Sequence, residues 1–242
     1  MQRLTSTFDR PPHWRWLLIW LFLIFGTAIT SPQTETAQAQ QQNPQGLIIQ
    51  SDTQEANSKT GVVTARGNVG ISYPSRKIQA RASLAQYDTK QKRILLTGNV
   101  TILQNGNTIE SESVLYLINE GRFIAQPRVQ QQVRSRYILP EEGGKGLIIQ
   151  SNSQEANTKT EIVIARGNVR LSYPGRKLQG RANIVEYNVK QKQIVLGGNV
   201  LVVQNGSSIQ GEMITYLIEE GRFVATPKPG APVQSIYIVP EQ

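Results

Sequence analysis

After residue 46 the chain alternates between apolar and polar residues with a period of two. Val69, Ile71 and Tyr73 are separated by small or polar residues, and the same spacing recurs at Val169 and Leu171. This period is typical of β-strands with one buried and one solvated face. Turn-forming Asn-Gly and Tyr-Pro pairs interrupt the alternation at close intervals. We therefore predict an all-β fold with about ten to twelve short, mostly antiparallel strands of roughly four to seven residues in each half.

The pattern is written twice. Residues 46–142 recur as residues 146–242, with a constant offset of 100 residues and no gap. A repeated β unit builds an elongated object by stacking, and we expect two facing sheets of short strands. The expected organisation is a first unit at 46–145, a second unit at 146–242, and a polar tether at 40–45.

The first 39 residues have the layout of a secretory leader. Arg3, Arg10 and Arg15 give a positive start, residues 16–25 are apolar, and small residues at Ala37 and Ala39 form a cleavage site. We predict cleavage after Ala39, with an uncleaved anchor as the alternative. Either outcome places the repeats on the far side of a membrane.

The amino-acid composition excludes several kinds of catalysis and metal binding from the repeats. The chain has no cysteine, and its single histidine, His13, lies in the leader. Disulfides, thiolate metal sites and imidazole catalysis are therefore not expected in the repeats. We predict no enzyme activity, catalytic residue, metal or cofactor, although a glycosidase with two carboxylates stays open as an alternative. The net charge of +9 favours anionic lipid or glycan as partner. Nucleic acid is not expected for an exported protein, and a solvated basic surface is the alternative.

The alternation also predicts a lining. If the two sheets are separated along one edge, their inner apolar side chains form an open lipid-binding groove. In a closed sandwich the same residues pack on one another. The predicted groove residues are Val69, Ile71, Ile78, Ala82, Leu84, Leu96, Val100, Ile102, Ile109, Phe123, Val169, Leu171, Leu178, Ala182, Ile184, Leu196, Val200, Val202, Ile209 and Phe223. Few of these are aromatic. Arg76, Lys77, Arg176 and Lys177 follow proline turns, so we expect them at the groove rim, either facing an anionic head group or solvated.

The ends of such a stack are open. Residues 47–50 and 236–239 are apolar and uncharged, so they are predicted edge segments. Unpaired edges associate with other chains by strand addition. We expect head-to-tail association of copies, or docking of a partner protein.

Several short segments resemble a known family. They are the Ile49-x-Ser51-Asp52 opening, the strand Thr97–Val100, the segment Ile209–Tyr216 and the close Gly221–Ala225. In this order they are similar to the OstA-like domain of the LptA family of periplasmic lipopolysaccharide-transport bridge proteins. The resemblance implies a twisted two-sheeted β jellyroll with an open V-shaped groove for acyl chains. It also implies head-to-tail association between an inner-membrane exporter and an outer-membrane acceptor.

Two functions follow as hypotheses. The first is a carrier that moves lipopolysaccharide or a related glycolipid through an apolar β groove. The second is a structural β filament or envelope scaffold that binds polysaccharide or partner proteins by its faces and edge strands.

Overall fold

The computed structural model describes residues 46–139, 146–227 and 229–238, which all fall in one compact unit. The predicted leader and tether lie outside the described residues. Each repeat supplies eight strands. They are β1 (Ile48–Gln50), β2 (Thr53–Asn57), β3 (Val62–Tyr73), β4 (Ile78–Asp88), β5 (Arg93–Gln104), β6 (Asn107–Leu117), β7 (Arg122–Gln126) and β8 (Val133–Tyr137), then β9 (Leu147–Ser151), β10 (Ser153–Asn157), β11 (Ile162–Tyr173), β12 (Leu178–Asn188), β13 (Gln193–Gln204), β14 (Ser207–Leu217), β15 (Arg222–Thr226) and β16 (Gln234–Ile236).

Helical structure in the described part is limited to short 3₁₀ helices. Two of them, η1 (Pro74–Arg76) and η3 (Pro174–Arg176), make the turns that follow β3 and β11. No helix in that part of the chain has the length and apolar character needed to cross a membrane.

The strands form one antiparallel sheet of 16 strands that is folded over into two layers. Each long strand runs through both layers and bends at its middle. Layer 1 contains β2, β7, β10 and β15 and the halves of the long strands paired with them, for example residues 62–66 of β3. Layer 2 contains β1, β8, β9 and β16 and the other halves, for example residues 69–73 of β3. Apolar side chains from both layers form a single core cluster. The all-β jellyroll built from tandem units is therefore confirmed.

In β3, β5, β11 and β13 the bend lies at a Gly-Asn pair inside the strand. Gly67 and Asn68 have φ angles of 73° and 46°, and the pairs at 98–99, 167–168 and 198–199 are alike. Two residues with positive φ break the register between β3 and β4 as a β-bulge, which bends the strand. We call this line of bends the corner. The hairpin turns lie at the opposite strand ends, and we call that side the mouth.

Side chains at the corner pack against these glycines. The Asn68 amide donates to both carboxylate oxygens of Asp52 at 3.0 and 3.2 Å, and the backbone amide of Asp52 donates to the Gly67 carbonyl at 3.0 Å. In the second repeat, the backbone amide of Asn152 donates to the Gly167 carbonyl at 2.9 Å. The acid at position 52 is thus replaced by an amide without loss of this backbone contact.

Gly167→Ala tests the role of the bulge. At Gly167 φ is 78°, and an added Cβ would stand 2.8 Å from the Asn152 amide nitrogen. We expect the free energy of unfolding to fall by about 1–3 kcal/mol, because a non-glycine residue is strained in this region. Gly70→Ala is the control, since a Cβ there meets no atom within 4 Å. Equal stability of the two variants in urea denaturation would contradict this account.

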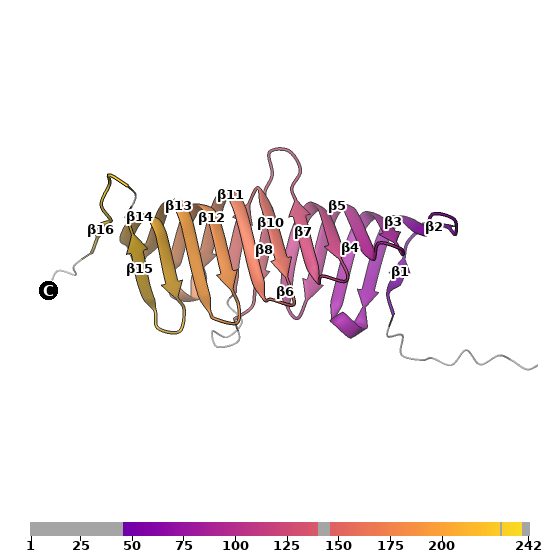
Figure 1. Ribbon diagram of the computed structural model, residues 1–242, viewed down its shortest axis with the longest axis horizontal. Coiled ribbons are helices and arrows are strands. Elements are labelled where there is room, and N and C mark those ends of the chain that lie inside the picture. Colours follow the sequence, from indigo (N-terminus) through magenta and orange to yellow (C-terminus); the bar gives the residue numbers. More distant parts are fainter. Residues whose placement is uncertain (1–45, 140–145, 228, 239–242) are drawn as a thin grey trace, which may run out of the picture. The chain divides into compact units, whose positions relative to one another are not determined.

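The sheet continues from one repeat into the other. In layer 1, β7 pairs with β10 from Ala125↔Gln154 to Arg122↔Asn157. In layer 2, β8 pairs with β9 from Val133↔Ser151 to Tyr137↔Leu147. Figure 1 shows the strands following one another along the long axis of this unit, from β1 and β2 to β15 and β16. The two repeats therefore do not close into separate barrels. The inner face of each layer continues from the first repeat into the second.

The predicted strand number and length were wrong. The structure has eight strands per repeat, and β3, β5, β11 and β13 have 12 residues each. Each Gly-Asn pair is a bend within a long strand, whereas the proline turns and the Asn-Gly turns at 105–106 and 205–206 do end strands.

Candidate functional site: the interior between the layers

The interior is lined by apolar side chains from both layers. Eighteen of the predicted groove residues lie in the core cluster or pack against it. They are Val69, Ile71, Ile78, Ala82, Leu96, Val100, Ile102, Ile109, Phe123, Val169, Leu171, Leu178, Ala182, Leu196, Val200, Val202, Ile209 and Phe223. Their placement follows from the alternation along each half-strand.

Two predicted groove residues face outward instead. Leu84 pairs with the exposed Arg66, and its neighbour Ala85 takes the inner position at 1% exposure. Ile184 is 40% exposed, and Val185 is the buried residue beside it. The register break in β4 and β12 lies just before Leu84 and Ile184, so the alternation changes phase there. A one-residue slip moves a side chain to the other face.

The interior also contains tyrosines that the predicted lining lacked. One row of layer 1 near the mouth runs across the strands as Tyr87, Ile94, Tyr116 and Phe123, and recurs as Tyr187, Ile194, Tyr216 and Phe223. The rings of Tyr116 and Phe123 are stacked, with their centroids 4.3 Å apart. Tyr137 of layer 2 meets Tyr187 edge-on at 5.7 Å. Continuing the alternation past the bulge, from Ala85 to Tyr87, would have found this row.

Most of the interior is closely packed. Tyr173, Tyr187 and Tyr216 are at most 1% exposed, and Ile194 and Ile214 are 0% exposed. A hydrocarbon chain would therefore have to displace these side chains to pass between the layers.

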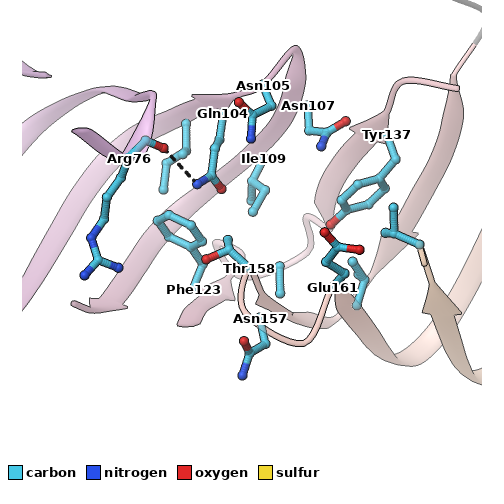
Figure 2. A pocket seen from close by; sticks show the side chains of 14 residues that line it. Arg76, Gln104, Asn105, Asn107, Ile109, Phe123, Tyr137, Asn157, Thr158 and Glu161 are labelled. Atoms are coloured by element: carbon cyan, nitrogen blue, oxygen red, sulfur yellow. Dashed lines mark hydrogen bonds between the residues drawn. The ribbon is translucent and has the colours of Figure 1, made fainter. Parts of the chain in front are cut away.

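A cavity of about 410 Å³ opens where the two repeats meet. Its apolar walls are Ile102 and Ile109 from layer 2 and Phe123, Ala156 and Val163 from layer 1. Polar residues surround it, and Figure 2 shows Asn105, Asn107, Asn157, Thr158 and Glu161 around the apolar side chains. The volume falls in the range of small-ligand sites, and half of the 14 lining residues are polar or charged.

The cavity has a simple cause in the sequence. The mouth row of layer 1 continues from Phe123 to Ala156 and Val163 before the next tyrosine, Tyr187. Ala156 and Val163 are smaller than the Tyr, Ile and Phe residues on either side of them. Space is therefore left at the junction, whereas within each repeat the large side chains fill the mouth.

The predicted rim arginines lie at the mouth. Arg76 lines the junction cavity and donates to the Tyr116 hydroxyl across the interior at 3.4 Å, and its guanidinium lies 5.5 Å from the Tyr73 ring centre. Its carbonyl accepts from the Gln104 amide at 3.2 Å (Figure 2). Burial raises the pKa of Tyr116, and the Arg76 charge acts in the opposite direction.

The corresponding residues of the second repeat also reach the mouth. The Arg176 guanidinium lies 3.9 Å from the place where a Cβ on Gly221 would stand, so it reaches a turn of the other layer. Lys77 and Lys177 are exposed and end the 3₁₀ turns in the left-handed conformation.

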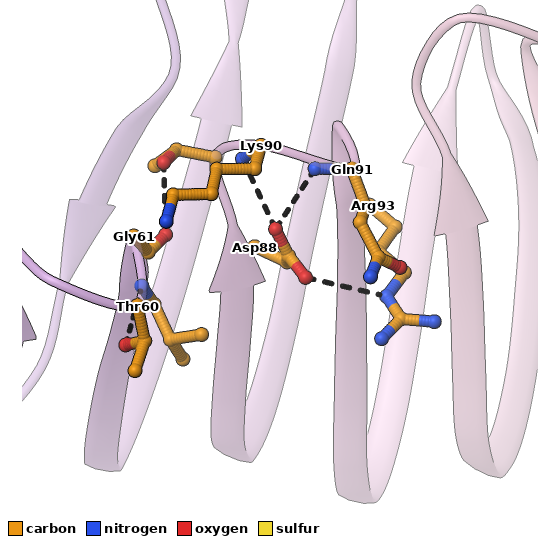
Figure 3. Close-up of polar contacts among 8 residues, drawn as sticks. Thr60, Gly61, Asp88, Lys90, Gln91 and Arg93 are labelled. Carbon is orange, nitrogen blue, oxygen red and sulfur yellow. Dashed lines mark hydrogen bonds and ion pairs between the residues drawn. The ribbon is translucent and has the colours of Figure 1, made fainter.

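Other lysines of the mouth tie neighbouring turns together. The Lys90 ammonium donates to the Lys59 carbonyl at 2.7 Å. Figure 3 shows the Asp88 carboxylate accepting from the backbone amides of Lys90 and Gln91. Lys159 donates to the Asn119 carbonyl at 2.6 Å. These cations stabilise the layer 1 turns.

Burial of Tyr137 makes the free energy of unfolding depend on pH in the alkaline range. Burial raises the pKa of its phenol well above the usual value near 10, and the neighbouring Ser135 acts in the opposite direction. Above about pH 10 the unfolded chain loses a proton that the folded chain keeps. The stabilisation is thus present below pH 10 and is lost as the pH rises towards the folded-state pKa.

We therefore expect the free energy of unfolding to fall above about pH 10, and to fall less steeply in Tyr137→Phe. Tyr237→Phe is the control, because Tyr237 is 69% exposed. Urea denaturation at several pH values measures the slope. An unchanged slope in Tyr137→Phe would contradict the prediction.

Among the described residues, no group of three or more His, Cys, Asp or Glu side chains is arranged to hold a metal ion. The interior offers apolar contact and a polar mouth.

Two facing layers, a bent edge and an apolar interior define the class of extended β jellyrolls with a lipophilic core. Both repeats match the family model described as "LptA/(LptD N-terminal domain) LPS transport protein", one over residues 70–122 and the other over 171–222. The resemblance to the LptA/OstA-like family that the sequence predicted is therefore confirmed, and it extends to both repeats.

Among the solved structures that are similar to this chain is LptH, the LptA-homologous periplasmic component of the lipopolysaccharide transport device of Pseudomonas aeruginosa. It is 14% identical, the match covers 81% of this chain and 96% of that chain, and the TM-score is 0.24. Among curated proteins, none matches this chain.

Proposed function

We propose that this chain is a periplasmic carrier that moves lipopolysaccharide or a related glycolipid between the inner and outer membranes. The observation that carries the proposal is the apolar interior. Its side chains form one cluster that includes residues of both repeats, and the junction cavity opens into it where the repeats meet. The description of the family that both repeats match names lipopolysaccharide transport. Residues 1–39 act as the export signal, and residues 46–145 and 146–242 act as two carrier units.

The acyl chains of the cargo occupy the interior, and its anionic head group stays at the mouth. Each buried methylene contributes about 0.8 kcal/mol, so a chain of ten methylenes would gain about 8 kcal/mol before the cost of moving side chains. Arg76 and Arg176, with the exposed Lys77 and Lys177, supply cations at the mouth that suit phosphate. No bond chemistry is needed, so binding and release are the whole activity.

Transfer requires partners at both ends. At the end of β16 and just after it the chain is apolar and exposed, with Ile236 at 57%, Tyr237 at 69% and Ile238 at 63% exposure. Such an edge accepts a strand from another chain. We propose that an inner-membrane exporter, an outer-membrane acceptor or a further copy of this chain pairs with β1 and β2 or with β15 and β16.

Mass spectrometry of organic extracts tests the proposal. Protein purified from its native periplasm should yield a glycolipid with several acyl chains. Protein from a strain lacking that glycolipid is the control. A native sample free of lipid would contradict the carrier and favour the envelope scaffold.

A further inference from the structure

The outer face of layer 2 carries a row of arginines that the carrier function does not use. One register row crosses the strands as Arg134 of β8, Gln150 of β9, Arg170 of β11 and Arg181 of β12. All three arginines are exposed. Neighbouring strands lie about 4.8 Å apart, so the row spans about 14 Å.

Within this row two like charges face each other. Arg170 is directly opposite Arg181 in the register of β11 and β12. Like charges in this position repel and destabilise a sheet. Neither arginine forms an ion pair with a described residue. The first repeat avoids the repulsion, because Gly70 faces Arg81 there. A bound anion would turn the repulsion into two favourable contacts.

A cleft of about 310 Å³ surrounds the two arginines. Gln150, Ser172 and Gln179 line it with amide and hydroxyl groups, and Ile148, Leu201 and Val203 add apolar surface. Sugar rings need this combination, because they present hydroxyl groups at the rim and C–H groups on the face. None of the lining residues is aromatic, so the cleft lacks the stacking platforms that single-stranded nucleic acids use.

The cleft is separate from the interior. Arg170 and Arg181 point away from the core, whereas their neighbours Val169, Leu171 and Ala182 are buried in it. Arg181 is four residues from Lys177 at the mouth, about 13 Å along the strand, and it lies next to the corner. The two guanidinium groups therefore lie on the opposite face of layer 2 from the apolar interior, so a ligand bound to them would not enter the interior.

We propose that this cleft binds an acidic saccharide chain free of lipid, with its carboxylate or phosphate groups on Arg170 and Arg181. Guanidinium groups bind such anions in a bidentate manner, and Gln150, Ser172 and Gln179 hydrogen-bond the sugar hydroxyls. The contact anchors the carrier to an envelope glycan while the interior stays free for cargo.

Calorimetric titration of the full chain with hexagalacturonate tests the proposal, and neutral maltohexaose is the ligand control. The double variant Arg170→Gln/Arg181→Gln should bind hexagalacturonate about tenfold more weakly. Arg81→Gln, at the matching position of the first repeat, should change the affinity less than about threefold. Binding should weaken as salt is raised. The single variant Arg170→Gln should raise the melting temperature at low salt by about 1–3 °C, because the repulsion is relieved.

Three results would overturn the proposal: no binding of hexagalacturonate, equal binding of maltohexaose, or equal losses in Arg81→Gln and in the double variant. Lipopolysaccharide loading of the same variants distinguishes this site from the carrier function. The proposal predicts normal loading in the double variant. A loss of loading there with unchanged hexagalacturonate binding would show that the arginines serve the cargo instead.

Discussion

Replacing Val163 with tryptophan should lower the amount of glycolipid bound by the purified protein at least about tenfold. Val163 is 3% exposed and lines the junction cavity, which has apolar walls from both layers. A tryptophan there would fill space that an acyl chain needs, and the loss of two methylenes of contact already corresponds to about tenfold in affinity. Lipid bound per protein is measured by mass spectrometry.

Ile164→Trp is the matched control. Ile164 is the next residue of β11 and faces outward between Glu155 and Glu186. It should load glycolipid like the unmodified chain. Normal loading in Val163→Trp, with both variants folded by circular dichroism, would show that the junction cavity is not on the path of the cargo.

Ile149→Asp should destabilise the fold by about 3–5 kcal/mol. Ile149 is 0% exposed and pairs with Ser135 of the first repeat and Leu171 of the second. A carboxylate there would be buried without a partner, which costs several kcal/mol. Because β8 and β9 join the repeats in layer 2, we also expect the repeats to unfold in separate steps.

Ile148→Asp provides the comparison. Ile148 lies on the outer face opposite Arg136, so an acid there meets a cation rather than the core. Its stability should stay within about 1 kcal/mol of the unmodified chain. Urea denaturation followed by circular dichroism measures both variants. Similar stability of the two would contradict the continuous core.

The sequence predicts much of the fold because side-chain alternation and turn residues are local signals. The β class, the tandem repeat and the turns at Pro74, Asn105 and Asn205 all follow from short segments. The bends do not, because Gly-Asn at 67–68 has the composition of a hairpin turn. Only the pairing of β3 with β4 on both sides of the bulge makes it a corner.

The interior was predictable up to the bulge. Counting every second residue from Ile78 reaches Ala82 correctly and then assigns Leu84 inward, where the register break has already changed the phase. The junction cavity has no local signal at all. It exists because Ala156 and Val163 of one repeat follow Phe123 of the other in the sheet, opposite Ile102 and Ile109.

Site-specific photocrosslinking tests the path of the cargo most directly. A photoreactive phenylalanine analogue at Ile102 or at its repeat partner Val202, both buried in the interior, should crosslink to glycolipid. The same analogue at Leu103 or Val203, on the outer face of the same strands, should not. Crosslinking at 103 and 203 with none at 102 and 202 would contradict passage between the layers.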